Sequence, residues 1–365
     1  MSFRLAAVAT VNPKLVSILF RVRELTRLSS ASLCTDQPRA ALAILICSKQ
    51  QIDITTSCRI MRHMTQKIMI KTCLGRLEGA YAPNTLRSYY ADACWFVDWC
   101  DERNLTAFPL GSNVLCACIE WHQGNYTYAS LRRRIVSLRR INTLLGFDDH
   151  SRTEDVYLAI RRLKRSIGRP PKQAAGINES LLSRMIAAQP STLVGIRNRA
   201  LLSLGYDFLA RRSELVALRA CDVTQCPDGT LRGIIRRSKT DQFGKGRLVF
   251  GSTRSAKLLK TWLRHQPRHI EPLFCAINSG TCLDRALCDR SVNEIIKRSL
   301  LKVKGVARPN YNDISGHSLR VGAAQDLLIK GYDIGAIMRA GGWSDVTTVS
   351  RYLKYSEQNV WAEAY

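Results

Sequence analysis

The sequence predicts a mainly α-helical protein with a small antiparallel sheet, arranged as two domains. Long stretches in both halves place apolar residues three and four positions apart, the spacing of one face of an α-helix. Residues 221–250 instead alternate short β-like runs with turns that contain glycine. Between the halves, residues 168–177 read GRPPKQAAGI, and paired prolines beside glycine and positive charge are typical of an exposed linker. We therefore expect a first domain at 73–168, a linker at 169–176 and a second domain at 177–365.

The first predicted domain is entirely helical. A helix is expected to begin at Pro83, because proline is favoured in the first helical turn, and its apolar stripe continues to Cys100. Three more helices with the same periodicity are expected at residues 112–122, 128–146 and 153–166.

The second predicted domain places its sheet between helices. Helices are expected at residues 178–189, 197–209 and 213–219. The β-like runs that follow are separated by the turns Pro227-Asp228-Gly229 and Phe243-Gly244-Lys245-Gly246. Helices are then expected to resume at Ser255 and to continue to Tyr365.

Residues 1–72 differ from the rest of the chain. They are rich in Arg, Ser and Thr, poor in acidic residues and only weakly periodic, and they include Met61, Met64 and Met69. We interpret them as a poorly ordered basic extension or as translation from a start placed too early. A basic arm on DNA and a targeting-like segment are the alternatives.

The chain is strongly basic, with 55 Lys and Arg against 29 Asp and Glu and a net charge of +26 at pH 7. Such a surplus indicates a polyanionic partner, and nucleic acid is the first candidate. No run of 18 or more apolar residues is present, so we expect a soluble protein. The 13 cysteines form no CxxC pair, and His265, His269 and Cys275 lack a fourth zinc ligand nearby, which favours free thiols and no metal.

The helix expected at 128–146 carries arginines outside its apolar stripe. The stripe consists of Leu131, Ile135, Leu138 and Leu145, so the guanidiniums lie on other faces. They could grip DNA phosphates, or they could simply face solvent. The arginines are Arg132, Arg133, Arg139 and Arg140.

Residues suited to phosphate chemistry occur in separate segments. Arg211 precedes a helix whose first turn holds Glu214, so the carboxylate can orient the guanidinium, although a weak surface ion pair would have the same pattern. His317 and Arg320 share a face of another helix and combine a group that titrates near pH 7 with a planar fork for phosphate oxygens. Farther on, Trp343 follows two glycines and Tyr352 comes nine residues later.

Together with Lys239 in the segment RRSKTDQFGKG, these residues occur in the order of a known family. The chain resembles the tyrosine recombinases, also called phage integrases. Within that family it is most similar to the Cre recombinase branch, through GHSLRVGAAQDLLIKG, AGGW and the tyrosine nine residues after Trp343. The resemblance covers about residues 80–365 and implies the two-domain tyrosine recombinase fold. In that fold an all-α SAM-like core-binding domain precedes an α+β catalytic domain.

The resemblance also implies a role for each residue. The guanidiniums would clamp the non-bridging oxygens of the scissile phosphate, with a buttressing carboxylate behind the first, while an imidazole and an indole contact the same phosphate. A hairpin lysine would protonate the leaving 5′ oxygen, and a tyrosine would attack. In chain order these residues are Arg211, Glu214, Lys239, His317, Arg320, Trp343 and Tyr352.

Two of these assignments have a rival nearby. Lys245 lies in the same loop as Lys239, but RSKT matches the sequence context of the family's lysine. Tyr355 lies three residues after Tyr352, but the family spacing from Trp343 is nine rather than twelve.

The implied activity is site-specific recombination, in which DNA strands are cut and rejoined through a 3′-phosphotyrosine without a metal, another cofactor or ATP. The implied partners are double-stranded recombination sites and three further copies of the chain, in a tetramer on DNA that dissociates to a monomer or weak oligomer. Only thirteen residues follow Tyr352, which is short for the C-terminal helix that docks into a neighbouring protomer in this family. A cytoplasmic location, on the nucleoid if the host is bacterial, would follow.

Two other functions would fit parts of the pattern. One is a DNA-binding relative that occupies sites without cleaving them, although such a protein has no need for the complete set of six catalytic residues. The other is a monomeric type IB topoisomerase, which shares the tyrosine chemistry but not the Cre-like motif. Base-reading residues vary within folds of this kind, so these motifs specify the chemistry and leave integration, excision, resolution and inversion open.

Overall fold

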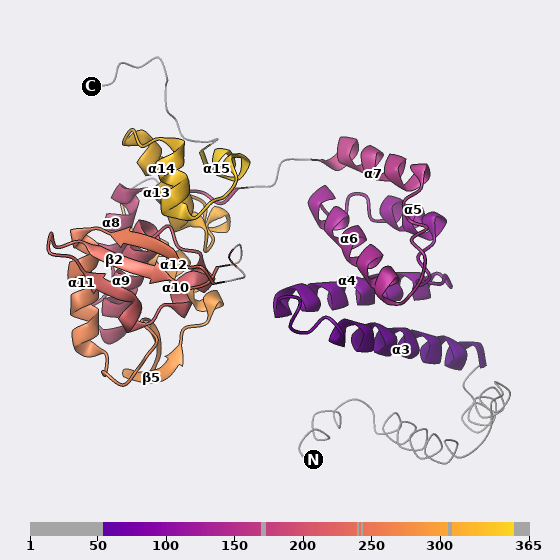
Figure 1. The fold of residues 1–365 in the computed structure, drawn as a ribbon, viewed down its shortest axis with the longest axis horizontal. Coiled ribbons are helices and arrows are strands. Elements are labelled where there is room, and N and C mark those ends of the chain that lie inside the picture. Colours follow the sequence, from indigo (N-terminus) through magenta and orange to yellow (C-terminus); the bar gives the residue numbers. More distant parts are fainter. Residues whose placement is uncertain (1–53, 169–172, 239–240, 242–243, 306–308, 354–365) are drawn as a thin grey trace, which may run out of the picture. The chain divides into compact units, whose positions relative to one another are not determined.

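The computed structural model describes residues 54–168, 173–238, 241, 244–305 and 309–353 (Figure 1). The chain divides into two compact units, residues 1–171 and 172–365. The division lies within the stretch GRPPKQAAGI, of which residues 169–172 are outside the described residues. Among the helices that are described, none combines the length and the apolar character needed to cross a membrane.

The first unit is built from helices that bury one apolar face each. Phe96 of α4, Leu115 of α5, Ile135 of α6 and Leu163 of α7 meet in one hydrophobic core. Pro83 stands in the first turn of α4, and the side chain of Thr127 caps α6 by accepting from the backbone N–H of Ser130. The helices are α3 (Ile54–Gly75), α4 (Pro83–Glu102), α5 (Ser112–Trp121), α6 (Tyr128–Leu144) and α7 (Glu154–Ile167).

Helix α3 changes the expected beginning of the first domain. The structure places residues 54–75 in a helix that packs on α4 and α6, so the boundary expected after residue 72 lies inside this element. Ile70 is 0% exposed and belongs to the core, although its segment looked only weakly periodic. The helix was missed because Lys, Arg and Thr interrupt its apolar residues and leave no clear stripe. Residues 1–53 lie outside the described residues.

Ile70→Ala is expected to destabilise the first unit by about 2–5 kcal/mol, since it opens a cavity in a core where the side chain has no exposure. Urea unfolding followed by tryptophan fluorescence measures the change. Ile68→Ala is the matched control because Ile68 is 61% exposed on the same helix, and it should stay within about 0.5 kcal/mol. Equal effects of the two substitutions would show that α3 is not packed as described.

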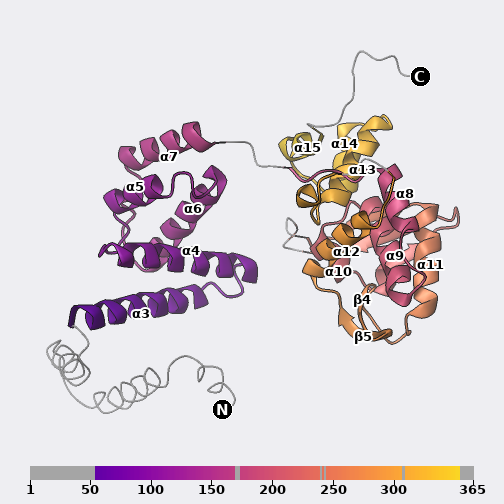
Figure 2. The same ribbon diagram turned by 180° about the vertical axis from the view of Figure 1, so that it is seen from behind.

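The second unit is organised around helix α9, which contacts α8, α10, α11, α13 and β3 (Figure 2). Helix α9 begins four residues earlier than predicted, because the side chain of Thr192 caps it by accepting from the backbone N–H of Gly195. It ends before Leu209, whose φ of 44° lies in the left-handed region that interrupts a helix. The first helices are α8 (Glu179–Ala187), α9 (Leu193–Asp207), α10 (Arg212–Ala217) and α11 (Thr253–His265), followed by α12 (Asp289–Leu301).

The predicted antiparallel sheet is present and has three strands in the order β1-β2-β3. They are β1 (Val223–Gln225), β2 (Leu231–Ile235) and β3 (Arg247–Gly251). Opposite Ile234 lies Leu248, and both face outward, whereas Ile235 and Val249 are buried. The 3₁₀ turn η2 (Ala220–Asp222) leads from α10 into β1.

A second, two-stranded sheet was not predicted. The expectation of continuous helix from Ser255 onward is wrong at β4 (Cys275–Asn278) and β5 (Thr281–Ala286), which form an antiparallel hairpin. Ser279 and Gly280 have φ values of 46° and 80°, as a tight two-residue hairpin turn requires. The sequence signal was Ser-Gly between two short runs of alternating residues.

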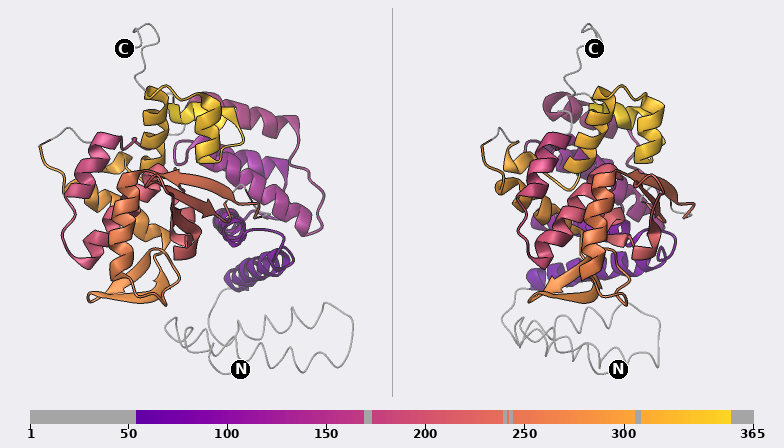
Figure 3. Two further views of the ribbon diagram at one scale, coloured as in Figure 1. Left: turned by 60° about the vertical axis from the view of Figure 1, so that its left-hand side comes forward. Right: turned by 90° about the vertical axis from the view of Figure 1, so that its left-hand side faces the viewer.

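The last three helices pack on one another (Figure 3). The 3₁₀ turn η3 (Tyr311–Asp313) precedes them. Gly342, with a φ of 64°, ends α14 in the left-handed conformation that favours glycine. The helices are α13 (Ser318–Ile329), α14 (Ile334–Gly341) and α15 (Val346–Leu353).

Candidate active site

Arg211 and Glu214 meet at the N-terminus of α10. Glu214 is 2% exposed, and its carboxylate accepts from both the backbone N–H and the guanidinium of Arg211, at 3.0 Å and 2.5 Å. A buried carboxylate that binds both parts of one residue fixes its direction more firmly than an exposed pair does. These two bonds are the contacts through which Glu214 would orient Arg211.

Among the predicted cations that the structure describes, Arg320 is the most enclosed. It is 1% exposed on α13, and its terminal nitrogens donate to the carbonyl of Leu209 and, at 2.7 Å, to that of Gly341. Burial, followed by the nearby charge of Arg211, lowers the pKa of Arg320 to about 10, so the guanidinium still holds its proton at neutral pH. These bonds use two of its five N–H donors.

Trp343 lies on this guanidinium, and the Tyr352 ring packs against Trp343 at an angle of 50°. Arg320 Cζ lies 4.0 Å from the centroid of the Trp343 ring, and the Trp343 and Tyr352 ring centroids are 5.2 Å apart. The backbone carbonyl of Tyr352 accepts from the side-chain amides of Gln173 and Gln325, each at 3.1 Å. The end of α15 is therefore held beside α13, and the half-buried Tyr352 comes to the same place as Arg320.

His317 lies one position before α13, and part of its ring reaches solvent. Desolvation by the surrounding protein lowers the pKa of His317, and the charges of Arg320, Arg212 and Arg211 lower it further. The imidazole is therefore mostly neutral at pH 7. A neutral ring can accept a proton at one nitrogen and donate a hydrogen bond from the other.

The two glycines before Trp343 have separate steric reasons. A Cβ on Gly341 would lie 1.9 Å from the Trp343 ring, and a Cβ on Gly342 would lie 2.5 Å from Cδ of Arg247. The sequence AGGW thus lets an indole and an arginine approach the backbone closely.

Lys239, the predicted leaving-group acid, lies outside the described residues, and so does the rival nucleophile Tyr355. The described part of the same loop is held by Asp241, which accepts from the backbone N–H groups of Lys245 and Gly246 at 3.1 Å and 2.8 Å. The exposed Lys245 lines a hollow of ≈660 Å³ together with Glu214. The described residues of the loop between β2 and β3 therefore border the site.

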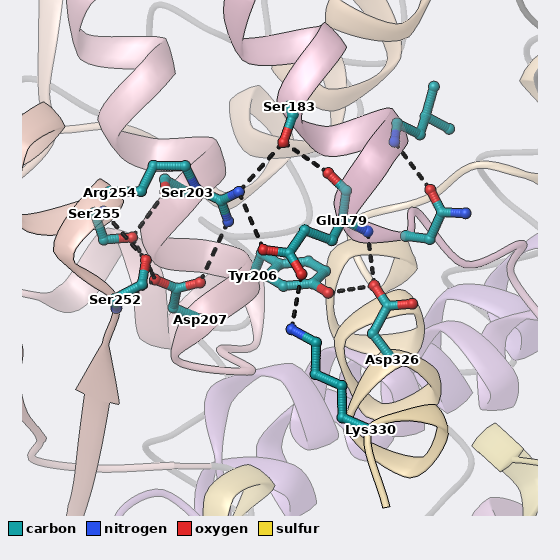
Figure 4. Close-up of polar contacts among 12 residues, drawn as sticks. Glu179, Ser183, Ser203, Tyr206, Asp207, Ser252, Arg254, Ser255, Asp326 and Lys330 are labelled. Carbon is teal, nitrogen blue, oxygen red and sulfur yellow. Dashed lines mark hydrogen bonds and ion pairs between the residues drawn. The ribbon is translucent and has the colours of Figure 1, made fainter. Parts of the chain in front are cut away.

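A polar network fixes α13 from its other end (Figure 4). The Tyr206 hydroxyl of α9 donates to Asp326 of α13, and Asp326 also accepts from the backbone N–H of Glu179 at 2.7 Å. Lys330 then binds the Glu179 carboxylate at 2.7 Å. These contacts lock α13, which carries Arg320, against α8 and α9.

Known proteins that are similar to this chain identify its family. The model of the phage integrase family matches residues 177–359, half of the chain. The chain belongs to the phage integrase family. It is a site-specific tyrosine recombinase that cleaves and rejoins DNA, as the sequence motifs predicted.

Curated relatives of this recombinase come from bacteria and a phage. An integrase/recombinase xerD homolog of Selenomonas ruminantium is 29% identical over 76% of this chain and 84% of its own. Recombinase cre of Escherichia phage P1 is 25% identical over 75% of this chain and 85% of its own. The expected family is confirmed, whereas these identities do not single out the Cre branch.

Solved structures show the same fold. The XerH site-specific recombinase bound to palindromic difH substrate matches with a TM-score of 0.56 at 19% identity, over 74% of this chain and 76% of that one. A lambda integrase dimer bound to a core site matches with a TM-score of 0.55 at 14% identity, over 97% and 90%. The expected two-domain recombinase fold is therefore confirmed.

The arginines predicted on α6 of the recombinase differ in what they contact. Arg133 makes a two-point contact with the buried carboxylate of Asp92, including one bond of 2.8 Å, and Arg139 donates to the side chain and carbonyl of Ser151. Arg132 is exposed, and Arg140 is half-buried with Cζ 5.8 Å from the Tyr81 ring. Two of the four therefore serve the fold of the first unit.

One residue of the site was missed by sequence reasoning. Arg247 begins β3 and shares the inward face of that strand with the buried Val249 and Gly251. A cation at an inward-facing strand position must find partners inside the protein, and this was the available signal. Its carboxylate partner is Glu214, at 3.3 Å.

Proposed function

We propose that Tyr352 is the nucleophile of this recombinase and that Arg211 and Arg320 bind the scissile phosphate. One observation carries the proposal: the Trp343 indole contacts both the Arg320 guanidinium, at 4.0 Å, and the Tyr352 ring, whose centroid is 5.2 Å away at an interplanar angle of 50°. Residues that are 32 positions apart in the chain thereby bring a fixed positive charge and a phenol to one place.

The proposed chemistry follows from the side chains. The Tyr352 oxygen attacks phosphorus and loses its proton, a phosphorus–oxygen bond to the 5′ oxygen breaks, and a 3′-phosphotyrosine is left. A phenol has a pKa near 10 in water, so its attack at neutral pH needs nearby positive charge and a proton acceptor. The guanidiniums would supply the charge, each worth about 2.7–4 kcal/mol as a preorganised donor. His317, mostly neutral at pH 7, is suited to accept a proton.

The leaving 5′ oxygen needs a proton donor. We assign this to Lys239, on the sequence context RSKT, with Lys245 as the alternative in the same loop. Because the phosphotyrosine conserves the phosphodiester bond energy, a 5′ hydroxyl from a second strand can reverse the step and join a new partner.

The experiment that tests this proposal traps the covalent intermediate. A duplex selected by the protein from a random-sequence pool is nicked beside the cleavage point, so that the short 5′-hydroxyl strand diffuses away and religation fails. We expect a protein–DNA adduct that survives denaturation and maps to the peptide containing Tyr352. Attachment of the DNA at Tyr355 would contradict the assignment of the nucleophile. Lys239→Ala should slow adduct formation on a normal substrate but not on one whose leaving group departs without a proton donor.

We propose that Arg132 contacts DNA phosphate and that Arg133 stabilises the fold. Arg132→Ala should weaken DNA binding and reduce the slope of log affinity against log salt by about 1, since one phosphate contact is lost. Arg133→Ala should instead destabilise the first unit by about 1–2 kcal/mol, because the buried Asp92 loses a two-point partner. Salt-dependent binding assays and urea unfolding measure both variants. The opposite pattern would reverse the two roles.

The remaining proposals concern assembly and place. We propose a tetramer on two recombination sites and a monomer or weak oligomer away from DNA, acting in the cytoplasm on the nucleoid of a bacterial host. The bacterial and phage origin of two relatives supports the bacterial host, and the tetramer follows from the family resemblance. We also propose that the chain belongs to the Cre branch of the family. The motif GHSLRVG with Trp343 and Tyr352 supports this, while the higher identity of the xerD homolog weighs against it. The tail beyond Leu353, which would make the contact between protomers, is outside the described residues.

A further inference from the structure

Arg247 contacts three of the segments that carry the candidate site. Its side chain is 15% exposed, and one terminal nitrogen donates to the carbonyl of Phe208, at 3.3 Å, and to that of Ala340. The other terminal nitrogen binds the buried carboxylate of Glu214 at 3.3 Å. One guanidinium therefore joins the end of α9, the end of α14 and the first turn of α10.

Arg247 and Arg320 bridge the same two backbone segments at successive residues. Arg320 donates to Leu209 and Gly341, and Arg247 donates to the residue before each of these. The left-handed conformation of Leu209 turns the chain between the two carbonyls of the first segment. In the second segment, Gly342 leaves room for the arginine, because a Cβ there would lie 2.6 Å from Nε of Arg247. The two segments are thus held together by a pair of neighbouring guanidiniums.

Glu214 connects this pair to the remaining arginine. Its Oε1 binds Arg211 and its Oε2 binds Arg247, so one buried carboxylate lies between two cations. Desolvation lowers the pKa of Arg247, while the charge of Glu214 opposes the change. Removal of Arg247 would leave the carboxylate with a single cationic partner and would leave two carbonyls without theirs.

We propose that Arg247 is a positioning residue for DNA cleavage, which sets Arg211 through Glu214 and sets Trp343 and Tyr352 through the end of α14. The inference rests on the proposed function, because it assumes that these residues meet the scissile phosphate. Arg247 itself lies behind them and does not touch DNA in this proposal. A misplacement of about 1 Å in such a site costs on the order of 100-fold in rate.

The test measures adduct formation on the selected, nicked duplex at saturating DNA, the DNA concentration for half saturation, and thermal unfolding. Arg247→Met should slow adduct formation on the order of 100-fold while half saturation changes by less than about threefold. Arg247→Lys, which keeps the charge but not the planar fork, should still be at least about tenfold slow. If Arg247→Met does not fold, Arg247→Lys replaces it as the test variant.

Arg254→Met is the matched control. Arg254 is a partly buried arginine of the same unit that forms ion pairs with Asp207 and Glu179, each at 3.6 Å. Within the described part of the chain, its polar contacts reach none of the proposed catalytic residues. It should lower thermal stability like Arg247→Met and leave the saturated rate unchanged. A near-normal rate in a folded Arg247 variant, or an equal loss in Arg254→Met, would overturn the proposal.

A double variant examines the route through Glu214. If Arg247 acts through the carboxylate of Glu214, the effects of the two substitutions overlap. Adduct formation by the Glu214→Gln, Arg247→Met double variant should then be only a few-fold slower than by the slower single variant. Full multiplication of the two effects would overturn that route. Tyr352→Phe in the otherwise unchanged protein keeps the two proposals apart, because it tests the nucleophile whatever the Arg247 variants do.

Discussion

Tyr352→Phe is expected to form no covalent adduct with the selected, nicked duplex and to bind that duplex as tightly as the unchanged protein. The substitution removes only the attacking oxygen. Phenylalanine keeps the ring that lies 5.2 Å from Trp343, and the backbone carbonyl at position 352 keeps its bonds to Gln173 and Gln325. Denaturing gels measure the adduct, and a mobility shift measures binding.

Tyr355→Phe is the natural control for this result. It should form the adduct at the normal rate, because its spacing from Trp343 does not match the family. An adduct that persists in Tyr352→Phe and disappears in Tyr355→Phe would move the nucleophile by three residues. It would refute the arrangement of Arg320, Trp343 and Tyr352 as the catalytic one.

Arg320→Lys is expected to reduce adduct formation by a factor on the order of 10²–10³, the usual loss when one preorganised donor is removed from a charge-stabilising site. It should also lower the stability of the second unit by about 1–3 kcal/mol for each carbonyl left unpaired. A lysine ends in a single nitrogen, which cannot bind Leu209 and Gly341 as the two nitrogens of the fork do.

Adduct formation and urea unfolding separate the two effects of Arg320→Lys. Arg254→Lys makes the same exchange at a partly buried arginine that pairs with Asp207 and Glu179 (Figure 4). It leaves the bonds of Asp326 that hold α13 in place and should affect stability alone. If Arg320→Lys lost stability but cleaved at the normal rate, Arg320 would be a scaffold residue and the phosphate clamp would have to be sought elsewhere.

The local spacing of apolar residues predicted an element correctly where one face of that element is buried. The helices from Pro83 to Ile167 lie within a few residues of their predicted ranges, because each buries one apolar stripe. It failed at β4 and β5, where the strands are short and the turn of Ser279 and Gly280 was the only strong signal. It also failed at α3, whose apolar residues are too interleaved with polar ones to show a clear stripe.

In the candidate site too, residue spacing predicted some features and left others to the tertiary structure. His317 and Arg320 are three residues apart, so helix geometry alone places them on one face. The contacts of Arg320 with Trp343 and of Glu214 with Arg247 join segments far apart in the chain. The order of the residue types was readable because the family keeps that order, but the contacts were not.

By itself the sequence determined the helical periodicity, the basic surplus that indicates DNA, and the set of side chains able to attack and bind a phosphodiester. These depend on residue identity and on spacings shorter than a helical turn or two. Only the tertiary structure decided which arginines have partners inside the fold. Arg133 and Arg139 found partners inside the first unit, and Arg247 found the carbonyls of Phe208 and Ala340. A guanidinium has the same five donors wherever it stands, so its role depends on the acceptors that folding brings to it.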